Sequence, residues 1–207
     1  YQSLNEEQRR AFLLLGEMIG GKIGLDGAAA LFDSSLEDAD DLLQELVGMC
    51  LLEEPQGDLY RFHDLIGAFA KDRGSVEIDT EERREAKGRL SAQYLSTAQR
   101  AAELLGPRGH ETVEDEGESH RTELTGRADA DRWFDLYQEN LTDSIEYFAD
   151  NAEGEKAWRL ADAVLRFYTQ RGQMGLLVSS HERVLQVSDK QGNKRGRAVT
   201  LIGLGIA

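Results

Sequence analysis

The chain has 207 residues, of which 40% are hydrophobic and 30% charged, and its formal net charge is −15 at pH 7. This charge disfavours a general polyanion-binding protein, because affinity for nucleic acids depends on Lys and Arg neutralising phosphates. The single cysteine, Cys50, cannot form an intramolecular disulfide, and beside Met49 and Leu51 we expect a buried, unreactive thiol in a cytoplasmic protein.

The sequence contains no signal peptide and no apolar run long enough to span a membrane. It begins at Tyr1 without a methionine and stops at Ala207 within a predicted helix. We therefore expect a piece of a longer protein that has no membrane partner.

The first 75 residues begin with three predicted helices. Asn5 is suited to cap the first helix, which we expect to end at Gly20-Gly21. Asp26 can start a short second helix. Ser35 can cap the third, whose apolar residues recur on one face.

A β-hairpin is predicted by two short strands, residues 50–53 and 59–62, that flank the turn sequence Pro55-Gln56-Gly57-Asp58. A fourth helix is expected from Asp64 to about Arg73. Three helices, a hairpin and a further helix make a compact winged-helix arrangement. We assign this winged-helix domain to residues 1–75.

Residues 76–207 are predicted to form a helical, tetratricopeptide-like domain, so the expected fold class is mainly α. Residues 75–80 read as a polar linker, and a long helix is expected from residue 81 to residue 105, before Pro107. Residues 109–126 are acidic and nearly free of large apolar side chains, which is typical of a surface loop. Further helices are expected to begin at Asp129 or Asp131, near Glu155, after Gly172 and after Asn193.

The C-terminal part shows weak internal repetition of the tetratricopeptide kind. The apparent spacing between units is about 40 residues, whereas the usual repeat has about 34. Such arrays present concave surfaces that bind peptides, so a protein or peptide partner is expected there. The residues that fit the middle and end of one unit are Tyr168, Gly172, Leu177 and Val184, and those that fit the opening of the next are Leu201, Leu204 and Gly205.

Most aromatic and histidine side chains of this domain are expected to be structural. His110 and His120 lie among acidic loop residues, but their spacing matches no metal-binding pattern, so a solvated loop is favoured over a metal site. His181 occupies a helix-packing position. Four aromatic residues are expected in the core, with a peptide-binding surface as the alternative: Trp133, Trp158, Phe167 and Tyr168.

The charge of the third predicted helix argues against DNA binding by the winged-helix domain. In DNA-binding versions of this fold a helix enters the major groove. Here residues 35–46 contain five acidic residues and no basic one, and no Lys or Arg occurs between Lys22 and Arg61. Such a helix would repel phosphates. We therefore expect no direct binding of nucleic acid by this chain.

The segment Tyr60-Arg61-Phe62-His63-Asp64-Leu65-Ile66-Gly67-Ala68-Phe69-Ala70 resembles the YRFHDLLRAYA-type sequence of actinobacterial STAND regulators of the SARP/AfsR type. In that family a winged-helix domain follows an NB-ARC nucleotide-binding module, and a tetratricopeptide-like region follows the winged helix. Two positions depart from the pattern: Phe62 replaces the methionine of the plant-type motif, and Gly67 stands where the bacterial sequence often has arginine.

The resemblance implies that His63 and Asp64 correspond to the His-Asp pair of the MHD motif. The histidine of that motif contacts the β-phosphate of ADP in the closed, inactive state, and exchange for ATP permits opening. An imidazole can donate a hydrogen bond to a phosphate oxygen. Asp64 is then expected to cap the following helix and hold the junction. The residues by themselves also allow a histidine that only satisfies backbone groups at a hairpin-to-helix corner.

A phosphate-binding G-x-x-x-x-G-K-[ST] loop is missing from the 207 residues, so we expect no enzyme and no cofactor in this chain by itself. The resemblance places ADP or ATP on an NB-ARC module of the parent protein. The predicted function is therefore the regulatory part of a STAND-type transcriptional regulator that couples nucleotide state to partner sensing. Two alternatives remain: a DNA-binding winged helix with a helical effector domain, and a scaffold without nucleotide coupling.

Overall fold

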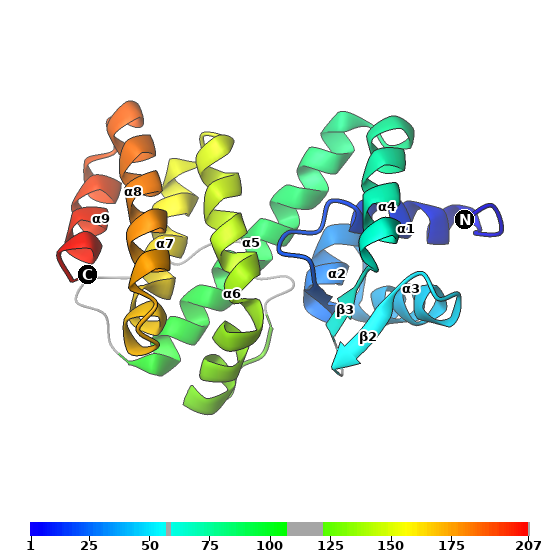
Figure 1. The fold of residues 1–207 in the computed structure, drawn as a ribbon, viewed down its shortest axis with the longest axis horizontal. Coiled ribbons are helices and arrows are strands. Elements are labelled where there is room, and N and C mark those ends of the chain that lie inside the picture. Colours follow the sequence, from blue (N-terminus) through cyan, green and yellow to red (C-terminus); the bar gives the residue numbers. More distant parts are fainter. Residues whose placement is uncertain (57–58, 107–121, 207) are drawn as a thin grey trace. The chain divides into compact units, whose positions relative to one another are not determined.

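The computed structural model describes residues 1–56, 59–106 and 122–206 of the chain (Figure 1). The described residues are mainly helical with one small β-sheet, which confirms the predicted fold class at this level. They divide into two compact units, Tyr1–Gln93 and Tyr94–Ala207. The prediction of a domain boundary at residue 75 stays a prediction.

The first unit combines helices with a three-stranded antiparallel sheet in the order β1-β3-β2. In the sheet, Ile23 pairs with Tyr60 and Glu53 pairs with Arg61. The long helix α5 (Thr80–Leu105) begins in this unit. The remaining elements are α1 (Glu6–Leu15), β1 (Ile23–Gly24), α2 (Leu25–Phe32), α3 (Leu36–Gly48), β2 (Glu53–Gln56), β3 (Leu59–Arg61) and α4 (Asp64–Glu77).

Two of the predicted helix caps are present. The Asn5 side chain accepts a hydrogen bond from the Gln8 backbone, and the Gln8 side chain accepts one from the Asn5 backbone, which together form a capping box. The Ser35 side chain accepts a hydrogen bond from the Asp38 backbone at the start of α3. These local interactions fix where α1 and α3 begin.

Several predicted element boundaries were wrong. Helix α1 ends at Leu15 rather than at Gly20-Gly21, and α2 begins at Leu25 after an N-cap at Gly24, so Asp26 lies within the helix. Strand β1 was not predicted, because two residues carry no readable periodicity. Helix α4 continues to Glu77, so the expected linker at residues 75–80 is reduced to a short connection before α5.

The prediction of a buried Cys50 was also wrong. Its side chain is exposed. Cys50 lies in the turn after α3 and has a positive φ of 57°, so the chain reverses direction there instead of continuing an apolar strand. Its apolar neighbours in the sequence therefore did not indicate its burial.

The core of the first unit is centred on Phe12, whose ring packs against other aromatic rings. The Phe12 centroid lies 5.4 Å from that of Phe62 and 5.7 Å from that of Tyr1. Helices α1 and α4 approach each other very closely at Gly16, where a Cβ atom would lie 2.7 Å from the Lys71 backbone nitrogen. The missing side chain allows this backbone contact.

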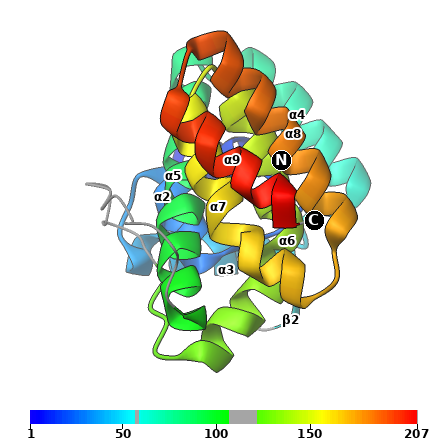
Figure 2. The ribbon, with the colours of Figure 1, turned by 90° about the vertical axis from the view of Figure 1, so that its left-hand side faces the viewer.

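The second unit is an array of helices that pack against one another in chain order. Each helix contacts the next, and α6 also contacts α8 while α7 contacts α9. The short turns before α8 and α9 contain Gly172 and Gly192, which have φ values of 67° and 66°. The N-cap of α6 is Gly126, so the prediction that this helix begins at Asp129 or Asp131 was wrong. The helices of the unit, seen in Figure 2, are α6 (Arg127–Asp150), α7 (Gly154–Gln170), α8 (Met174–Gln191) and α9 (Lys194–Ile206).

Aromatic side chains form the core of this unit, as predicted. The Phe134 and Phe167 rings stack with centroids 5.0 Å apart. The Tyr94 hydroxyl accepts a hydrogen bond of 3.0 Å from the buried Asn140 side chain. All four aromatic residues predicted for the core are buried, namely Trp133, Trp158, Phe167 and Tyr168.

His181 is buried between α8 and α9, which confirms its predicted packing role. Its Nδ1 donates a hydrogen bond of 2.9 Å to the Leu177 carbonyl. Burial lowers the pKa of His181 below its usual value of 6.5, because desolvation disfavours the imidazolium, and the bond to Leu177 opposes this shift only in part. The native unit therefore holds a neutral imidazole.

This buried imidazole predicts a stability that declines in acid. Below about pH 6.5 the unfolded chain binds a proton that the native chain does not, so His181 lowers the free energy of unfolding progressively until its native pKa is reached. Urea unfolding of wild type and His181→Gln at about pH 7.5 and about pH 5.5 measures this effect. We expect a smaller acid-induced loss of stability in His181→Gln than in wild type.

Candidate functional site

The predicted site residue His63 lies at the corner between β3 and α4. It is the N-cap residue of α4, with extended backbone angles of −66° and 144°, but its side chain does not bond to the helix backbone. Phe62, the preceding residue, packs against Phe12 in the core. The Phe62 ring therefore fixes one side of the corner in the core, while the His63 side chain on the other side is 60% exposed.

The His63 imidazole contacts the carboxylate of Glu53 on β2. His63 Nε2 lies 2.9 Å from Glu53 Oε1, and Arg61 Nε lies 2.9 Å from Glu53 Oε2. The antiparallel pairing of Glu53 with Arg61 across the hairpin brings the three side chains together. Because all three side chains are partly exposed, each contact contributes only about 0–1 kcal/mol to stability.

Asp64 does not have the capping role predicted for it. The chain enters α4 at His63, so Asp64 is the first helical residue and its side chain is exposed. A carboxylate there is favourable near the positive end of the helix dipole. It therefore supports α4 electrostatically without bridging to its backbone.

Helix α4 carries exposed apolar residues beyond the corner. The side chains of Leu65, Phe69 and Val76 are 86%, 42% and 74% exposed. Their spacing places them on one face of the helix. A protein surface with such a face beside an exposed imidazole is suited to contact another protein domain.

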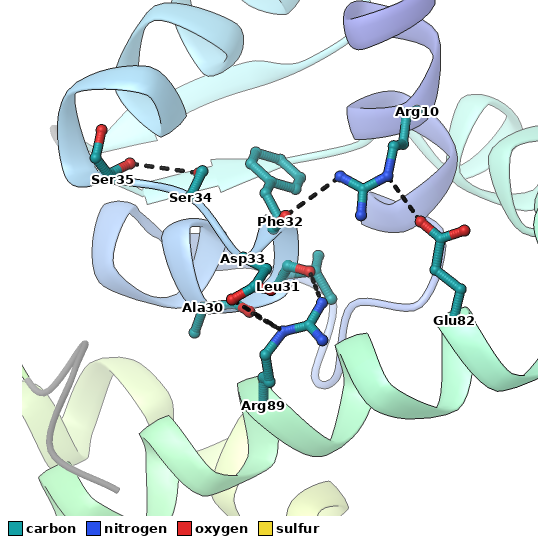
Figure 3. Close-up of polar contacts among 9 residues, drawn as sticks. All are labelled: Arg10, Ala30, Leu31, Phe32, Asp33, Ser34, Ser35, Glu82 and Arg89. Atoms are coloured by element: carbon teal, nitrogen blue, oxygen red, sulfur yellow. Dashed lines mark hydrogen bonds and ion pairs between the residues drawn. The ribbon is translucent and has the colours of Figure 1, made fainter.

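A second polar cluster holds the C-terminal end of α2 (Figure 3). Arg89 of α5 donates hydrogen bonds of 3.0 Å to the Ala30 carbonyl and 3.1 Å to the Leu31 carbonyl. Arg10 of α1 donates one of 3.2 Å to the Phe32 carbonyl, and its Nε lies 2.7 Å from Glu82 on α5. We call these interactions the α2 clasp.

The α2 clasp satisfies carbonyl groups that the end of every helix leaves without intrahelical partners. Asp33, the C-cap residue, turns away in the left-handed conformation with φ of 59°. The last turn of α2 has no basic residue of its own, so both guanidinium groups come from other helices. Sequence reasoning missed the clasp, since its spacings of 22 and about 58 residues have no local pattern.

A cleft of about 480 Å³ lies beside the clasp, between α1, α3 and the turn that joins α2 to α3. Carboxylates predominate among its charged groups, and such a lining disfavours phosphate. Within residues 1–56, 59–106 and 122–206, no group of three potential ligand side chains could hold a metal ion. The acidic residues of the cleft are Glu7, Asp33, Asp38, Asp41 and Glu45, with Arg10 as its basic residue.

The other three histidines considered in the sequence analysis are not part of this site. His110 and His120 belong to residues 107–121, which the structure does not describe. His181 is buried and contributes to packing. None of the described helices has the length and apolar character that a membrane span requires.

Comparison with known proteins finds similarity to bacterial regulators. The chain is 42% identical over 102 residues to the regulatory protein AfsR of Streptomyces coelicolor and 40% identical over 99 residues to that of Streptomyces griseus. Each match covers 47% of this chain but only 10% of the relative, so the chain spans about a tenth of the length of the curated relatives it matches. Family models give no match, and neither do solved structures.

Proposed function

We propose that the chain is the regulatory part of an AfsR-type transcriptional regulator and that it couples the nucleotide state of an NB-ARC module to partner sensing. In this proposal the first unit is a winged-helix domain and the second is a tetratricopeptide-like array. Three observations support it: the similarity to AfsR, the helices and three-stranded sheet of the first unit, and the consecutive helix packing of the second.

The observation that carries the proposal is the state of His63. Its imidazole is exposed at a helix N-terminus, makes no cap bond, and contacts a partly exposed carboxylate. A phosphate approaching this corner would meet a hydrogen-bond donor and the positive end of the α4 dipole. In this proposal the β-phosphate of ADP replaces Glu53 as the partner of His63, and this contact marks the closed, ADP-bound state of the module.

The corner supplies one wall of a nucleotide site and not the whole site. A nucleotide held in place needs a loop whose backbone amides surround the phosphates, and we propose that the NB-ARC module provides it. ADP and ATP are therefore cofactors of the parent protein in this proposal. The chain itself acts as a binding and signalling part and not as an enzyme.

The exposed apolar face of α4 supports the same proposal. Leu65 follows Asp64 directly, so a domain that presented a nucleotide to His63 would also meet Leu65 and Phe69. Burying these side chains would add apolar contact energy of about 25 cal/mol per Å² to a weak polar contact. We propose this face as the contact surface for the NB-ARC module.

Direct DNA reading by the first unit is disfavoured by α3. Its acidic side chains Glu37, Asp38, Asp41 and Glu45 are exposed. They would face phosphates with the same sign of charge. A mobility-shift titration of the chain with duplex DNA separates the two functions: salt-sensitive binding at micromolar concentrations would favour the DNA-reading alternative.

His63→Ala in the full-length regulator is expected to weaken ADP retention by about tenfold or more, because a charge-assisted hydrogen bond contributes about 1.5–3 kcal/mol. The measurement is the ADP content of the purified protein, determined by chromatography after denaturation. Glu53→Gln should retain ADP, because it releases the imidazole without removing it. Lys71→Ala, at an exposed position of the same helix, is the surface control. Equal ADP content in wild type and His63→Ala would refute nucleotide sensing.

A further inference from the structure

Alternation along the chain places Arg61 and His63 on the same side of the first unit. Successive residues of an extended segment point to opposite faces, so residues two apart share a face. Tyr60 and Phe62 point into the core, since Tyr60 is 2% exposed and Phe62 packs against Phe12. Arg61 and His63 therefore point outward together, and their side chains are 53% and 60% exposed.

Both outward side chains contact one carboxylate, and each uses a different oxygen of it. Glu53 Oε1 lies 2.9 Å from His63 Nε2, and Arg61 Nε donates a hydrogen bond of 2.9 Å to Glu53 Oε2. The imidazole and the guanidinium are thus arranged around a single anion with two acceptor oxygens. A phosphate group presents oxygens of the same kind, and a guanidinium binds carboxylate and phosphate with the same donor geometry.

The acidic residues of this region disfavour a phosphate that arrives from solution. Glu53 offsets the charge of Arg61, and its neighbour in the sequence, Glu54, is an exposed acidic residue. Asp64, which follows His63, is exposed and acidic as well. The whole chain carries a formal net charge of −15, so a free anion meets a potential of its own sign. A phosphate therefore reaches Arg61 and His63 only when another domain holds it there and Glu53 moves aside.

We infer that Arg61 is a second phosphate-binding residue and that Glu53 competes with the phosphate for both donors. This inference rests on the function proposed above, in which His63 meets the β-phosphate of ADP. When the NB-ARC module presents that phosphate, Arg61 and His63 both turn from Glu53 to the phosphate oxygens. The β-phosphate is then bound by two side chains of this chain, whereas His63 alone would supply a single donor.

The exchange is favourable because the contacts that are lost are weak and those that are gained are stronger. Ion pairs between exposed side chains contribute little, since water and salt screen them. A phosphate held between two domains is shielded from water, and charge-assisted hydrogen bonds are strong in such surroundings. The Glu53 side chain is 32% exposed, so its carboxylate can move into solvent. Because Glu53 recaptures both donors when the phosphate leaves, it lowers the affinity for ADP.

Arg61→Ala in the full-length regulator tests the role of Arg61. We expect an affinity for ADP about tenfold below wild type and an unchanged affinity for AMP, which lacks the β-phosphate. Both affinities are measured on nucleotide-free protein by competition against a fluorescent ADP analogue. Arg61→Lys keeps the charge without the planar fork of donors, so its affinity for ADP should lie between the two. Arg84→Ala, which breaks an ion pair of similar exposure with Glu81, is the surface control.

Glu53→Gln tests the competition in the same assay. Glutamine keeps the size of the side chain and removes its charge, so it holds His63 and Arg61 less firmly. We expect the affinity for ADP to rise about three- to tenfold. Glu54→Gln removes the same charge from the next residue of β2 and should bind ADP like wild type, which separates a specific competitor from a general effect of net charge.

The inference is overturned if Arg61→Ala binds ADP like wild type, or if it loses affinity for ADP and AMP equally, which would indicate that Arg61 only supports the hairpin. It is also overturned if Glu53→Gln binds ADP no more tightly than Glu54→Gln. If Arg61→Ala does not fold, as judged by circular dichroism, Arg61→Lys decides in its place.

These outcomes differ from a failure of the proposed function, which is a wild-type ADP content in His63→Ala. Loss of ADP in His63→Ala together with wild-type affinity in Arg61→Ala would retain nucleotide sensing by His63 and remove Arg61 from the site. Wild-type ADP content in His63→Ala would remove both.

Discussion

Replacing Phe134 with alanine is expected to lower the free energy of unfolding of the Tyr94–Ala207 unit by about 3–5 kcal/mol. The Phe134 side chain is fully buried, stacks on Phe167 at 5.0 Å, and contacts the edge of Trp133 at 5.5 Å. Truncation removes the transfer free energy of the ring and leaves a cavity that its two rigid aromatic neighbours, Trp133 and Phe167, cannot fill. Urea unfolding followed by circular dichroism measures the loss.

The matched control is Ile202→Ala, which removes an apolar side chain that is 65% exposed. It should change the free energy of unfolding by less than about 0.5 kcal/mol. A Phe134→Ala variant as stable as this control would show that the stacked aromatic rings do not form the core of the unit.

The second large effect is expected at Gly16, where alanine should destabilise the Tyr1–Gln93 unit by about 2–3 kcal/mol. The backbone angles of Gly16 are ordinary, with φ of −62° and ψ of −18°, so alanine can adopt them. The cost comes from the neighbouring helix: a Cβ atom would lie 2.7 Å from the Lys71 nitrogen and 2.8 Å from the Ala70 carbonyl carbon. These are backbone atoms of α4, which cannot rotate away as a side chain can.

Gly48→Ala provides the comparison within the same unit. A Cβ atom at Gly48, the last residue of α3, would meet no atom within 4 Å. Alanine there should be neutral or stabilising by up to about 1 kcal/mol, because glycine is a poor helix former. Thermal unfolding of the two variants separates the effect of close packing from that of helix propensity. Similar midpoints would mean that α1 and α4 do not touch at Gly16.

The parts of the fold that could be predicted from the sequence are those fixed by neighbouring residues. Asn5 and Ser35 cap helices through atoms three residues away, so their roles are visible in a short window. Helical periodicity likewise revealed α6 to α9. Strand β1 was missed because it exists only by pairing with β3, some 36 residues later in the chain.

The candidate site was predictable in position but not in its interactions. The sequence placed His63 at a strand-to-helix corner, where it lies. Its contact with Glu53 depends on the register of the hairpin, and the Arg89 contacts of the α2 clasp depend on where α5 meets α2. Both are set by tertiary packing, which residue spacing does not encode. The exposure of Cys50 could not be predicted either, because it goes with the left-handed backbone conformation of Cys50 itself, which its apolar neighbours in the sequence do not reveal.

The close approach at Gly16 has a mechanical consequence for the His63 corner. Where two helices meet backbone to backbone, no flexible side chain lies between them to absorb a displacement. We therefore expect a displacement of α4 at its N-cap, His63, to be passed to α1, which also packs against α4 through the rings of Phe12 and Phe69. In the function proposed above, a phosphate that bound at the corner would therefore also act on the packing of α1 against α4.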